Sequence, residues 1–165
     1  MNRAKDIIEE FMIAANGVTA RYLSSRKFPS LRRVVRTPKR WERIVGIAQE
    51  HGFKLPSNPD SRALDDFLMK EKTADPLRFP DLSLSIIKLM GAGEYIADSP
   101  GDTAPPGHFG LAVRDYTHST APNRRYPDLI TQRLLKAAMA QHPVPYEKED
   151  LEALGKHCTE EEEWV

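Results

Sequence analysis

Near the start of the chain, apolar residues recur at spacings of three and four positions, and acidic residues separate them. The apolar positions are Ile7, Ile8, Phe11, Met12, Ala15 and Val18. Because this period places the apolar side chains on one face of an α-helix, the pattern predicts a first helix, with Gly17 weakening its last turn. Residues 31–35 form a short segment that ends in two valines, which predicts a strand.

Five more helices are predicted further along the chain. Thr37 and Pro38 supply a cap and a first-turn proline for a helix that runs to Gly52. Helical patterns also cover residues 61–72, 82–90, 127–138 and 148–165. Residues 98–107 contain three prolines and two glycines and predict an irregular loop, and alternation over residues 109–113 predicts a second strand. The expected fold class is α+β, mostly helical with a few short strands.

Composition narrows the class of protein. The chain has 165 residues, of which 40% are hydrophobic and 29% charged, as expected for one ordinary domain. No apolar run approaches the roughly 20 residues that a bilayer-spanning helix needs, and no apolar segment follows the charged N-terminus as in a secretory leader. With Cys158 as the single cysteine, we expect no internal disulfide and no multi-thiolate zinc site. We therefore expect a cytoplasmic protein without a membrane partner.

The charges cancel overall but are distributed unevenly, with 24 Lys and Arg against 24 Asp and Glu. Residues 21–43 carry nine basic side chains against the single acid Glu42, whereas residues 147–163 carry eight acids against two lysines. Both runs can be solvated helix faces, but a local excess of arginine and lysine can also neutralise the phosphates of a nucleic acid. The zero net charge therefore does not exclude an RNA partner.

Residues 116–128 hold the densest group of unusual residues, a polar turn of small hydroxyl side chains followed by Arg124 and Arg125 just before a predicted helix. Pro122 fixes the turn, and the unpaired N–H groups and dipole of a helix N-terminus favour an anion. An arginine fork beside them suits a phosphate. The residues alone leave two interpretations open: a phosphate site, or an arginine that pairs with Asp128 or another carboxylate.

Residues 108–111 read H-F-G-L, residues 116–129 read Y-T-H-S-T-A-P-N-R-R-Y-P-D-L, and residues 8–16 read I-E-E-F-M-I-A-A-N. These separated motifs resemble the RNB domain of the ribonuclease II and ribonuclease R group of exoribonucleases. The family pattern H-F-G-L, then Y-x-H-F-T-S-P-I-R-R-Y-P-D-L, matches most of residues 108–111 and 116–129. Residues 8–16 resemble the family's I-E-E-F-M-x-x-A-N helix. Three positions depart from the usual phenylalanine, serine and isoleucine, namely Ser119, Ala121 and Asn123. The turn keeps both arginines and its proline, so the departures indicate a subfamily rather than a loss of function.

The resemblance implies a processive, magnesium-dependent, hydrolytic 3'–5' exoribonuclease that acts on single-stranded RNA and releases nucleoside 5'-monophosphates. Arg124 matches the family arginine that contacts the scissile phosphate region and stabilises the charge that develops in hydrolysis. Glu10, more than Glu9, matches a family glutamate near the 3'-terminal nucleotide. Arg125 is expected to be a second contact to the RNA backbone. Tyr126 completes the RNA-binding set, with its ring expected to pack rather than to stack on a base.

Two histidines of the motif, His108 and His118, are expected to stabilise the turn through hydrogen bonds rather than to act as acid or base. In the family, the aspartates that hold magnesium lie upstream of the I-E-E-F-M helix, at which this chain begins. Asp60, Asp65 and Asp66 have the wrong spacing for such a cluster, so we expect a turn residue followed by two residues on a helix surface. Mg²⁺ is expected in the intact enzyme, with no metal ligand among the residues present.

We therefore expect residues 1–165 to be the C-terminal portion of an RNB catalytic domain, truncated at both ends and inactive by itself. The expected partners are single-stranded RNA, the remainder of the parent domain and flanking RNA-binding barrels. Apolar surface around Ile7, Phe11 and Trp164 is expected to be exposed and to promote self-association. Two other classes remain open: a non-catalytic RNA-binding module that uses residues 21–43, and a small helical scaffold without a ligand.

Overall fold

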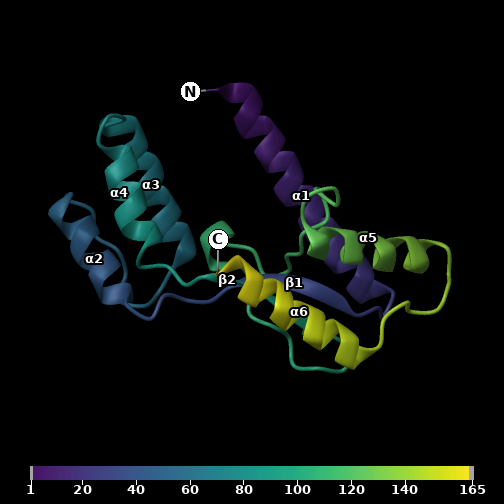
Figure 1. Ribbon diagram of the computed structural model, residues 1–165. Helices are drawn as coiled ribbons and strands as arrows, with labels where there is room; N and C mark the ends of the chain where they lie inside the picture. The colour runs from purple at the N-terminus through teal and green to yellow at the C-terminus, as the bar shows by residue number, and fades with distance from the viewer. Residues whose placement is uncertain (1, 164–165) are drawn as a thin grey trace. The chain divides into compact units, whose positions relative to one another are not determined.

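The computed structural model describes residues 2–163, and Figure 1 shows the order of their helices and strands. The elements are α1 (Arg3–Ser25), β1 (Ser30–Val35), α2 (Trp41–Glu50), α3 (Ser61–Ala74), α4 (Phe79–Ile87), β2 (Gly93–Asp98), the 3-10 helix η1 (Phe109–Leu111), α5 (Tyr126–Met139) and α6 (Lys148–Glu162). The described residues thus form six α-helices and only two short strands, which confirms the predicted α+β, mostly helical class. None of these helices is long and apolar enough to cross a membrane. The chain folds as two units.

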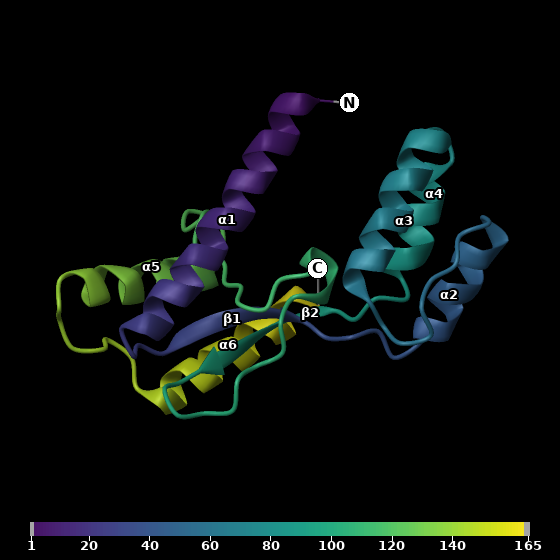
Figure 2. The same ribbon diagram turned by 180° about the vertical axis from the view of Figure 1, so that it is seen from behind.

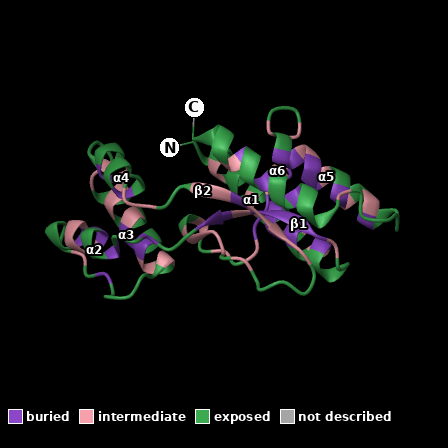
Figure 3. Cartoon of the chain, turned by 60° about the horizontal axis from the view of Figure 1, so that its bottom comes forward, coloured by how far each residue is buried: buried purple, intermediate pink, exposed green. Residues whose placement is uncertain are grey.

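The first unit contains α1, β1, β2, α5 and α6. The two strands pair in one sheet, α6 lies along β2, and α1 crosses α5 (Figures 1 and 2). Figure 3 shows buried residues gathered on α5, α6 and β1. The core side chains are Leu23, Leu31, Ile130, Leu134, Ala138 and Leu151. A β-carbon at Gly155 of α6 would lie 2.9 Å from the main-chain oxygen of Tyr95, so this glycine permits the close approach of α6 to β2.

The segment that precedes α5 pairs with strand β1 through the first residues of the segment, Tyr116 and Thr117. The main-chain N–H of Arg33 donates to the carbonyl oxygen of Tyr116 at 2.9 Å. The hydroxyl of Thr117, which is fully buried, donates to the carbonyl oxygen of Leu31 at 2.5 Å. These two hydrogen bonds fix the beginning of residues 117–125, the segment that carries both arginines of the motif, against the strand.

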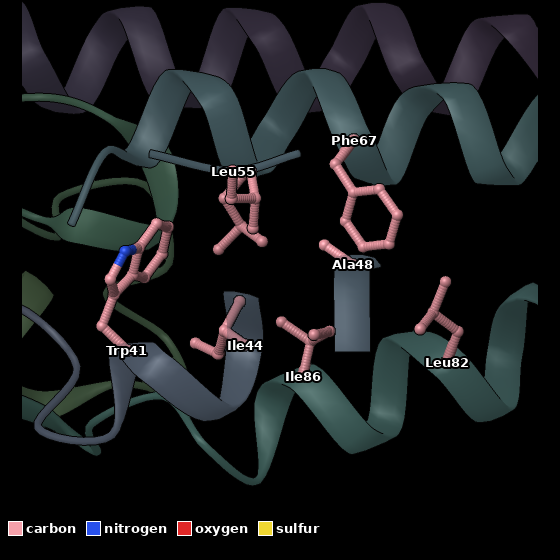
Figure 4. Close-up of a cluster of buried hydrophobic side chains, with 8 residues drawn as sticks. Trp41, Ile44, Ala48, Leu55, Phe67, Leu82 and Ile86 are labelled. Carbon is pink, nitrogen blue, oxygen red and sulfur yellow. The ribbon is translucent and has the colours of Figure 1, made fainter. Parts of the chain in front are cut away.

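The second unit contains α2, α3, α4 and η1. Its core is one cluster of buried side chains, and Figure 4 shows the following members pointing toward one another: Trp41, Ile44, Ala48, Leu55, Phe67, Leu82 and Ile86. Leu64 belongs to the same cluster. Phe109 of η1 packs edge-on against Trp41, with 6.0 Å between the ring centroids. The indole N–H of Trp41 donates to the carbonyl oxygen of Pro56 at 2.9 Å, so the polar group of this ring is satisfied at the edge of the cluster.

The strand predicted over residues 109–113 is wrong. Phe109–Leu111 form a single 3-10 turn, and Ala112 has a φ of 54°, which reverses the chain direction. His108 and Val113 therefore face each other in an isolated bridge, in which the N–H of His108 donates to the carbonyl oxygen of Val113 at 2.8 Å. The apolar alternation in this segment reflects the packing of Phe109 in the second unit and not a β-ladder.

The actual second strand, β2, is not predicted from the sequence. Its six residues alternate weakly, and only Tyr95 is buried, because the strand depends on distant segments for its environment. One such contact comes from α6, where the hydroxyl of Thr159 accepts the main-chain N–H of Tyr95 at 2.9 Å. A contact across more than 60 positions leaves no local pattern from which the strand could be predicted.

Several helix boundaries differ from the prediction. α1 continues through Gly17, which is buried, and ends only at Ser25. α2 begins at Trp41, so that Pro38 precedes the helix instead of occupying its first position. α4 begins at Phe79, three residues before the predicted start, because proline fits the first turn of a helix and Pro80 lies there.

The apolar face predicted for α1 is largely exposed in its N-terminal half. Ile7 is 50% exposed and Phe11 is 71% exposed. The buried residues of the helix all lie further along it, namely Asn16, Gly17, Ala20 and Leu23. The exposure predicted for Ile7 and Phe11 is therefore confirmed, and Trp164 lies outside the described residues.

Candidate functional site

The turn at residues 117–125 is fixed to α1 and α5 by side-chain hydrogen bonds. Asn16 of α1 is 2% exposed, and its Oδ1 accepts both the main-chain N–H of Ser119 at 2.9 Å and the hydroxyl of Ser119 at 2.8 Å. The amide nitrogen of Asn16 donates to the hydroxyl of Tyr116 at 3.2 Å. Gln132 of α5 donates to the carbonyl oxygen of Ser119 at 2.7 Å. Hydrogen bonds from α1 and α5 therefore fix both main-chain polar groups of Ser119, its N–H and its carbonyl oxygen.

A buried carboxylate holds the next part of the turn. Asp128, in the first turn of α5, is fully buried, and its Oδ2 accepts the main-chain N–H of Ala121 at 2.9 Å. The same oxygen accepts hydrogen bonds from Nε and Nη2 of Arg125, at 3.2 and 2.8 Å. An acid in this position also interacts favourably with the helix dipole. Of the two interpretations that the sequence leaves open, pairing with Asp128 therefore holds for Arg125.

Arg124 has a different environment from its neighbour. Its side chain is exposed, and within residues 2–163 its guanidinium forms no hydrogen bond or ion pair. Together with Arg125, Tyr126 and Pro127 it lines a pocket of about 230 Å³ at the start of α5. The remaining lining residues come from β2 and α6, namely Tyr95, His157, Cys158, Glu161 and Glu162. All the guanidinium donors of Arg124 are thus available to an anion that enters this pocket.

The residues predicted to bind RNA are brought together only in part. Arg124, Arg125 and Tyr126 line the same pocket. Tyr126 is 48% exposed, so the packing that was expected for its ring is not observed. Glu10 is exposed on α1 and does not line the pocket. Its helix is nevertheless joined to the turn of Arg124 through Asn16, six positions further along α1.

The two histidines of the motif are neutral near pH 7. Nδ1 of His118 lies 2.8 Å from the hydroxyl of Tyr95, and burial, reinforced by nearby Arg125, lowers the pKa of His118 to about 3. His108 lies edge-on to Tyr116, with 5.3 Å between the ring centroids, and burial lowers the pKa of His108 to about 4. The contact of His118 with Tyr95 agrees with a stabilising role for this histidine.

Two residues that line the pocket, Tyr95 and Glu162, both contact Arg33. The guanidinium of Arg33 lies 4.5 Å from the ring centre of Tyr95, and its Nη1 donates to Glu162 at 2.7 Å. Burial raises the pKa of Tyr95 to about 12, although Arg33 opposes the shift. Burial also raises the pKa of the Cys158 thiol, so this cysteine is not an activated nucleophile.

The basic segment at residues 21–43 does not form one exposed cationic surface. Arg32 is 3% exposed, and its guanidinium donates to Asp115 at 3.0 Å and to the hydroxyl of Ser24 at 2.6 Å. It also forms an ion pair with Asp98 at 3.3 Å. Burial raises the pKa of Asp98 even though Arg32 lowers it. An arginine held in this way is not available to phosphates, so part of the basic run is structural.

The described residues do not fit a magnesium ion. No group of three or more His, Cys, Asp or Glu side chains within residues 2–163 is arranged to hold a metal. The carboxylate of Asp60 caps α3 by accepting the N–H of Ala63 at 3.0 Å. Asp65 and Asp66 are exposed on α3. The surface position predicted for Asp65 and Asp66 is confirmed, whereas Asp60 is the N-cap of α3 and not a turn residue.

Of the two residues that hold the turn, Asp128 is named from the sequence only as a possible partner of an arginine, and Asn16 is not singled out. Both lie inside the two recognised motifs, and both are buried polar residues. Their positions in the sequence could have indicated their structural roles. Asp128 follows Arg125 by three positions at a helix start, where an ion pair can form, and Asn16 is polar on the side of α1 that is buried.

Comparison with known proteins gives a consistent assignment. A family model described as the RNB domain matches residues 1–141. Over 96% of this chain, ribonuclease R of Aquifex aeolicus is 34% identical, that of Thermotoga maritima 33% and that of Escherichia coli 32%. The matched region covers 22%, 23% and 20% of these relatives, so the chain spans about a fifth of their length.

Solved structures with a similar fold include a pseudonuclease and an RNase R. The structure of yeast Ssd1, described as a pseudonuclease, matches with a TM-score of 0.80 at 25% identity, over 92% of this chain and 19% of that one. Mycoplasma genitalium RNase R in complex with ribose methylated single-stranded RNA matches with a TM-score of 0.77 at 25% identity, over 98% of this chain and 26% of that one.

Proposed function

Since the chain belongs to the RNB domain family, we propose that it is part of a hydrolytic, magnesium-dependent 3'–5' exoribonuclease and supplies the arginine of its active site. The observation that carries this proposal is the contrast between two adjacent arginines. Asp128 neutralises Arg125, whereas Arg124 is exposed at a pocket and has no carboxylate partner in the described part of the chain. A turn fixed at Ser119 and Ala121 presents Arg124 in this way.

Arg124 suits the chemistry of phosphodiester hydrolysis. In phosphoryl transfer, most of the catalysis comes from positioning and from neutralising the charge that builds up on the phosphate oxygens. A guanidinium can donate two parallel hydrogen bonds to such oxygens. Because the turn is fixed before RNA arrives, little reorganisation of the protein is needed at the moment of reaction. We assign the phosphate at the scissile bond to Arg124.

The substrate that we propose is single-stranded RNA, degraded processively to nucleoside 5'-monophosphates. A related RNase R has been solved in complex with a ribose methylated single-stranded RNA, which supports this choice. Tyr126 is half exposed in the pocket and can contact the nucleotide held by Arg124. Glu10 is an exposed carboxylate on α1 that can accept hydrogen bonds from the hydroxyls of a 3'-terminal ribose. For Arg125, the nitrogen not bonded to Asp128 remains for a second backbone contact.

The chain covers about a fifth of its relatives, and we therefore propose that residues 1–165 are the C-terminal portion of an RNB catalytic domain in a longer protein. The carboxylates that hold magnesium and the flanking RNA-binding barrels would belong to the rest of that protein. A magnesium ion held there would activate the attacking water. The residues of this chain would bind and orient the RNA and stabilise the charge on its phosphate.

The experiment that tests the proposal compares variants of the longer protein on a single-stranded RNA. Arg124→Ala is expected to reduce kcat by about 100-fold or more, as for the loss of one preorganised donor to a transition state. A matched control is Arg26→Ala, which removes another exposed arginine of the same unit and is expected to leave kcat unchanged. An unchanged kcat for Arg124→Ala would refute the assigned role.

The chain by itself provides a second test. We expect purified residues 1–165 not to hydrolyse single-stranded RNA in the presence of magnesium, because the described residues offer no site for the ion. Processive cleavage by a preparation free of other nucleases, lost in Arg124→Ala, would show that the metal half of the active site is not needed. That result would contradict the proposed division of the active site.

A second candidate function is a non-catalytic RNA-binding module, which the match to the pseudonuclease Ssd1 favours. In that case the exposed basic residues of segment 21–43, such as Arg40 and Arg43, would bind RNA phosphates without hydrolysis. RNA binding would then weaken with salt and with the Arg40→Ala and Arg43→Ala substitutions, and Arg124→Ala would have little effect. Arg32 is not part of such a surface because it is buried.

A further inference from the structure

One side chain connects the helix of Glu10 with the turn of Arg124. Asn16 lies on α1, six positions after Glu10, and Ser119 lies five positions before Arg124. The Oδ1 atom of Asn16 accepts two hydrogen bonds from Ser119, one from its main-chain N–H and one from its hydroxyl. Each is shorter than 3.0 Å. Among the described residues this is the side-chain contact of α1 that reaches the turn directly.

The environment of Asn16 makes this connection rigid. The residue is 2% exposed, so water does not compete for its polar atoms. Its amide nitrogen donates to the hydroxyl of Tyr116, whose ring lies edge-on to His118 at 5.7 Å between centroids. Both ends of the amide are therefore bonded, which fixes its orientation. A buried, satisfied polar group specifies one arrangement of its neighbours because every alternative leaves a polar group unpaired.

The turn is also held from the side of α5, so Asn16 completes a three-point attachment. Gln132 binds the carbonyl oxygen of Ser119, and Asp128 binds the main-chain N–H of Ala121. These two contacts come from α5 and fix the turn to that helix. The contact with Asn16 adds a direct side-chain link from the turn to α1, beside the packing of α1 on α5.

We propose that Asn16 is a positioning residue that fixes the helix carrying Glu10 relative to the turn carrying Arg124, and so sets the spacing of the two contacts to the 3'-terminal nucleotides of the RNA. This inference rests on the proposed function of Arg124. The serine at position 119 gives this chain a second hydrogen bond to Asn16, because the phenylalanine usual in the resembling family has no hydroxyl. The positioning is therefore tighter in this chain than the family pattern requires.

The test measures kcat and KM of the longer protein in a double-mutant cycle. Asn16→Ala is expected to lower kcat by about 10-fold to 100-fold, because a small misplacement of a catalytic group has an effect of this size. KM should change by less than about threefold if the pocket itself is intact. In an Arg124→Ala background, Asn16→Ala should lower kcat by less than about twofold, because the group that it positions is already absent.

A matched control and a milder variant keep the outcome interpretable. Thr19→Ala, one turn further along α1, removes a hydroxyl that bonds only to the carbonyl oxygen of Ala15 and should leave kcat unchanged. Ser119→Ala removes one of the two hydrogen bonds to Asn16 without creating a large cavity. It should lower kcat by about threefold, and again only when Arg124 is present, so the test stands even if Asn16→Ala does not fold.

Hydrogen exchange on residues 1–165 gives a readout that needs no activity. Asn16→Ala should speed the exchange of the Ser119 amide more than that of amides in the core of α5, because it opens the turn locally. The inference is overturned if the variants lower kcat by the same factor with and without Arg124, or if exchange rises equally everywhere. If Arg124→Ala itself leaves kcat unchanged, the proposed function fails, which is a different result from the failure of the Asn16 inference.

Discussion

The two adjacent arginines should differ sharply in their effect on stability. Arg125→Ala removes the cation that faces Asp128, whose carboxylate is fully buried and whose Oδ1 has no hydrogen-bond partner among residues 2–163. Breaking a buried pair by removing one partner costs about 3–5 kcal/mol. Because the side chain of Arg125 is 24% exposed, solvent screens part of this interaction, and we expect about 2–3 kcal/mol. Arg124→Ala removes no such partner and should cost less than about 0.5 kcal/mol.

The assay is urea and thermal unfolding of residues 1–165, followed by circular dichroism. For a chain of this size, the loss at Arg125 corresponds to a decrease in Tm of about 5–10 °C. Arg125→Lys keeps the charge but cannot reproduce the two bonds from Nε and Nη2, so it should lie between Arg125→Ala and the unchanged chain. Equal losses for Arg124→Ala and Arg125→Ala would refute the reasoning, because they would show that the two side chains are held alike.

Three further predictions concern other parts of the chain. In the folded chain the pKa of His118 is lowered to about 3, so as the pH falls below about 6.5 the unfolded state takes up a proton first. The free energy of unfolding therefore decreases by up to about 1.4 kcal/mol per pH unit. His118→Gln should reduce the loss of stability between pH 7 and pH 5, whereas His157→Gln, at an exposed position, should not. Arg32→Ala should destabilise the chain by about 3–5 kcal/mol in chemical unfolding, and Arg43→Ala, at an exposed position, by less than about 0.5 kcal/mol. Phe11→Glu should reduce self-association of residues 1–165 in sedimentation experiments, because Phe11 is 71% exposed; an unchanged association would show that other surfaces are involved.

Local patterns predicted most helices of this fold and few of its long-range features. The helix at 61–72 was predicted from its helical pattern alone, and the structure adds the cap that Asp60 provides. β2 was not, because its partners lie in β1 and α6, far away in the sequence. The alternation at 109–113 was misleading, since an alternating pattern does not distinguish a strand from a turn whose apolar residues pack elsewhere.

The prediction of the candidate site was limited in the same way, because its details depend on contacts between distant parts of the chain. The motif around Arg124 and Arg125 marked the turn correctly, but its sequence could not tell which arginine is paired. That distinction depends on the direction of the Asp128 side chain at the start of α5. The role of Asn16 depends on α1 meeting a turn about 100 positions later, which no local pattern records. For the basic run at 21–43, the sequence left both interpretations open and could not show that Arg32 is buried.

The most direct test of the central claim is a single-turnover experiment on the longer protein, with Arg124→Ala compared with the unchanged enzyme. Saturating enzyme separates the hydrolytic step from RNA binding, and equilibrium binding is measured in parallel. Because Arg124 is proposed to act on the charge that develops at the phosphate, the rate of the step should fall by about 100-fold or more, with RNA affinity within about threefold. A loss of affinity with an unchanged single-turnover rate would contradict the claim and would make Arg124 a simple RNA-binding residue.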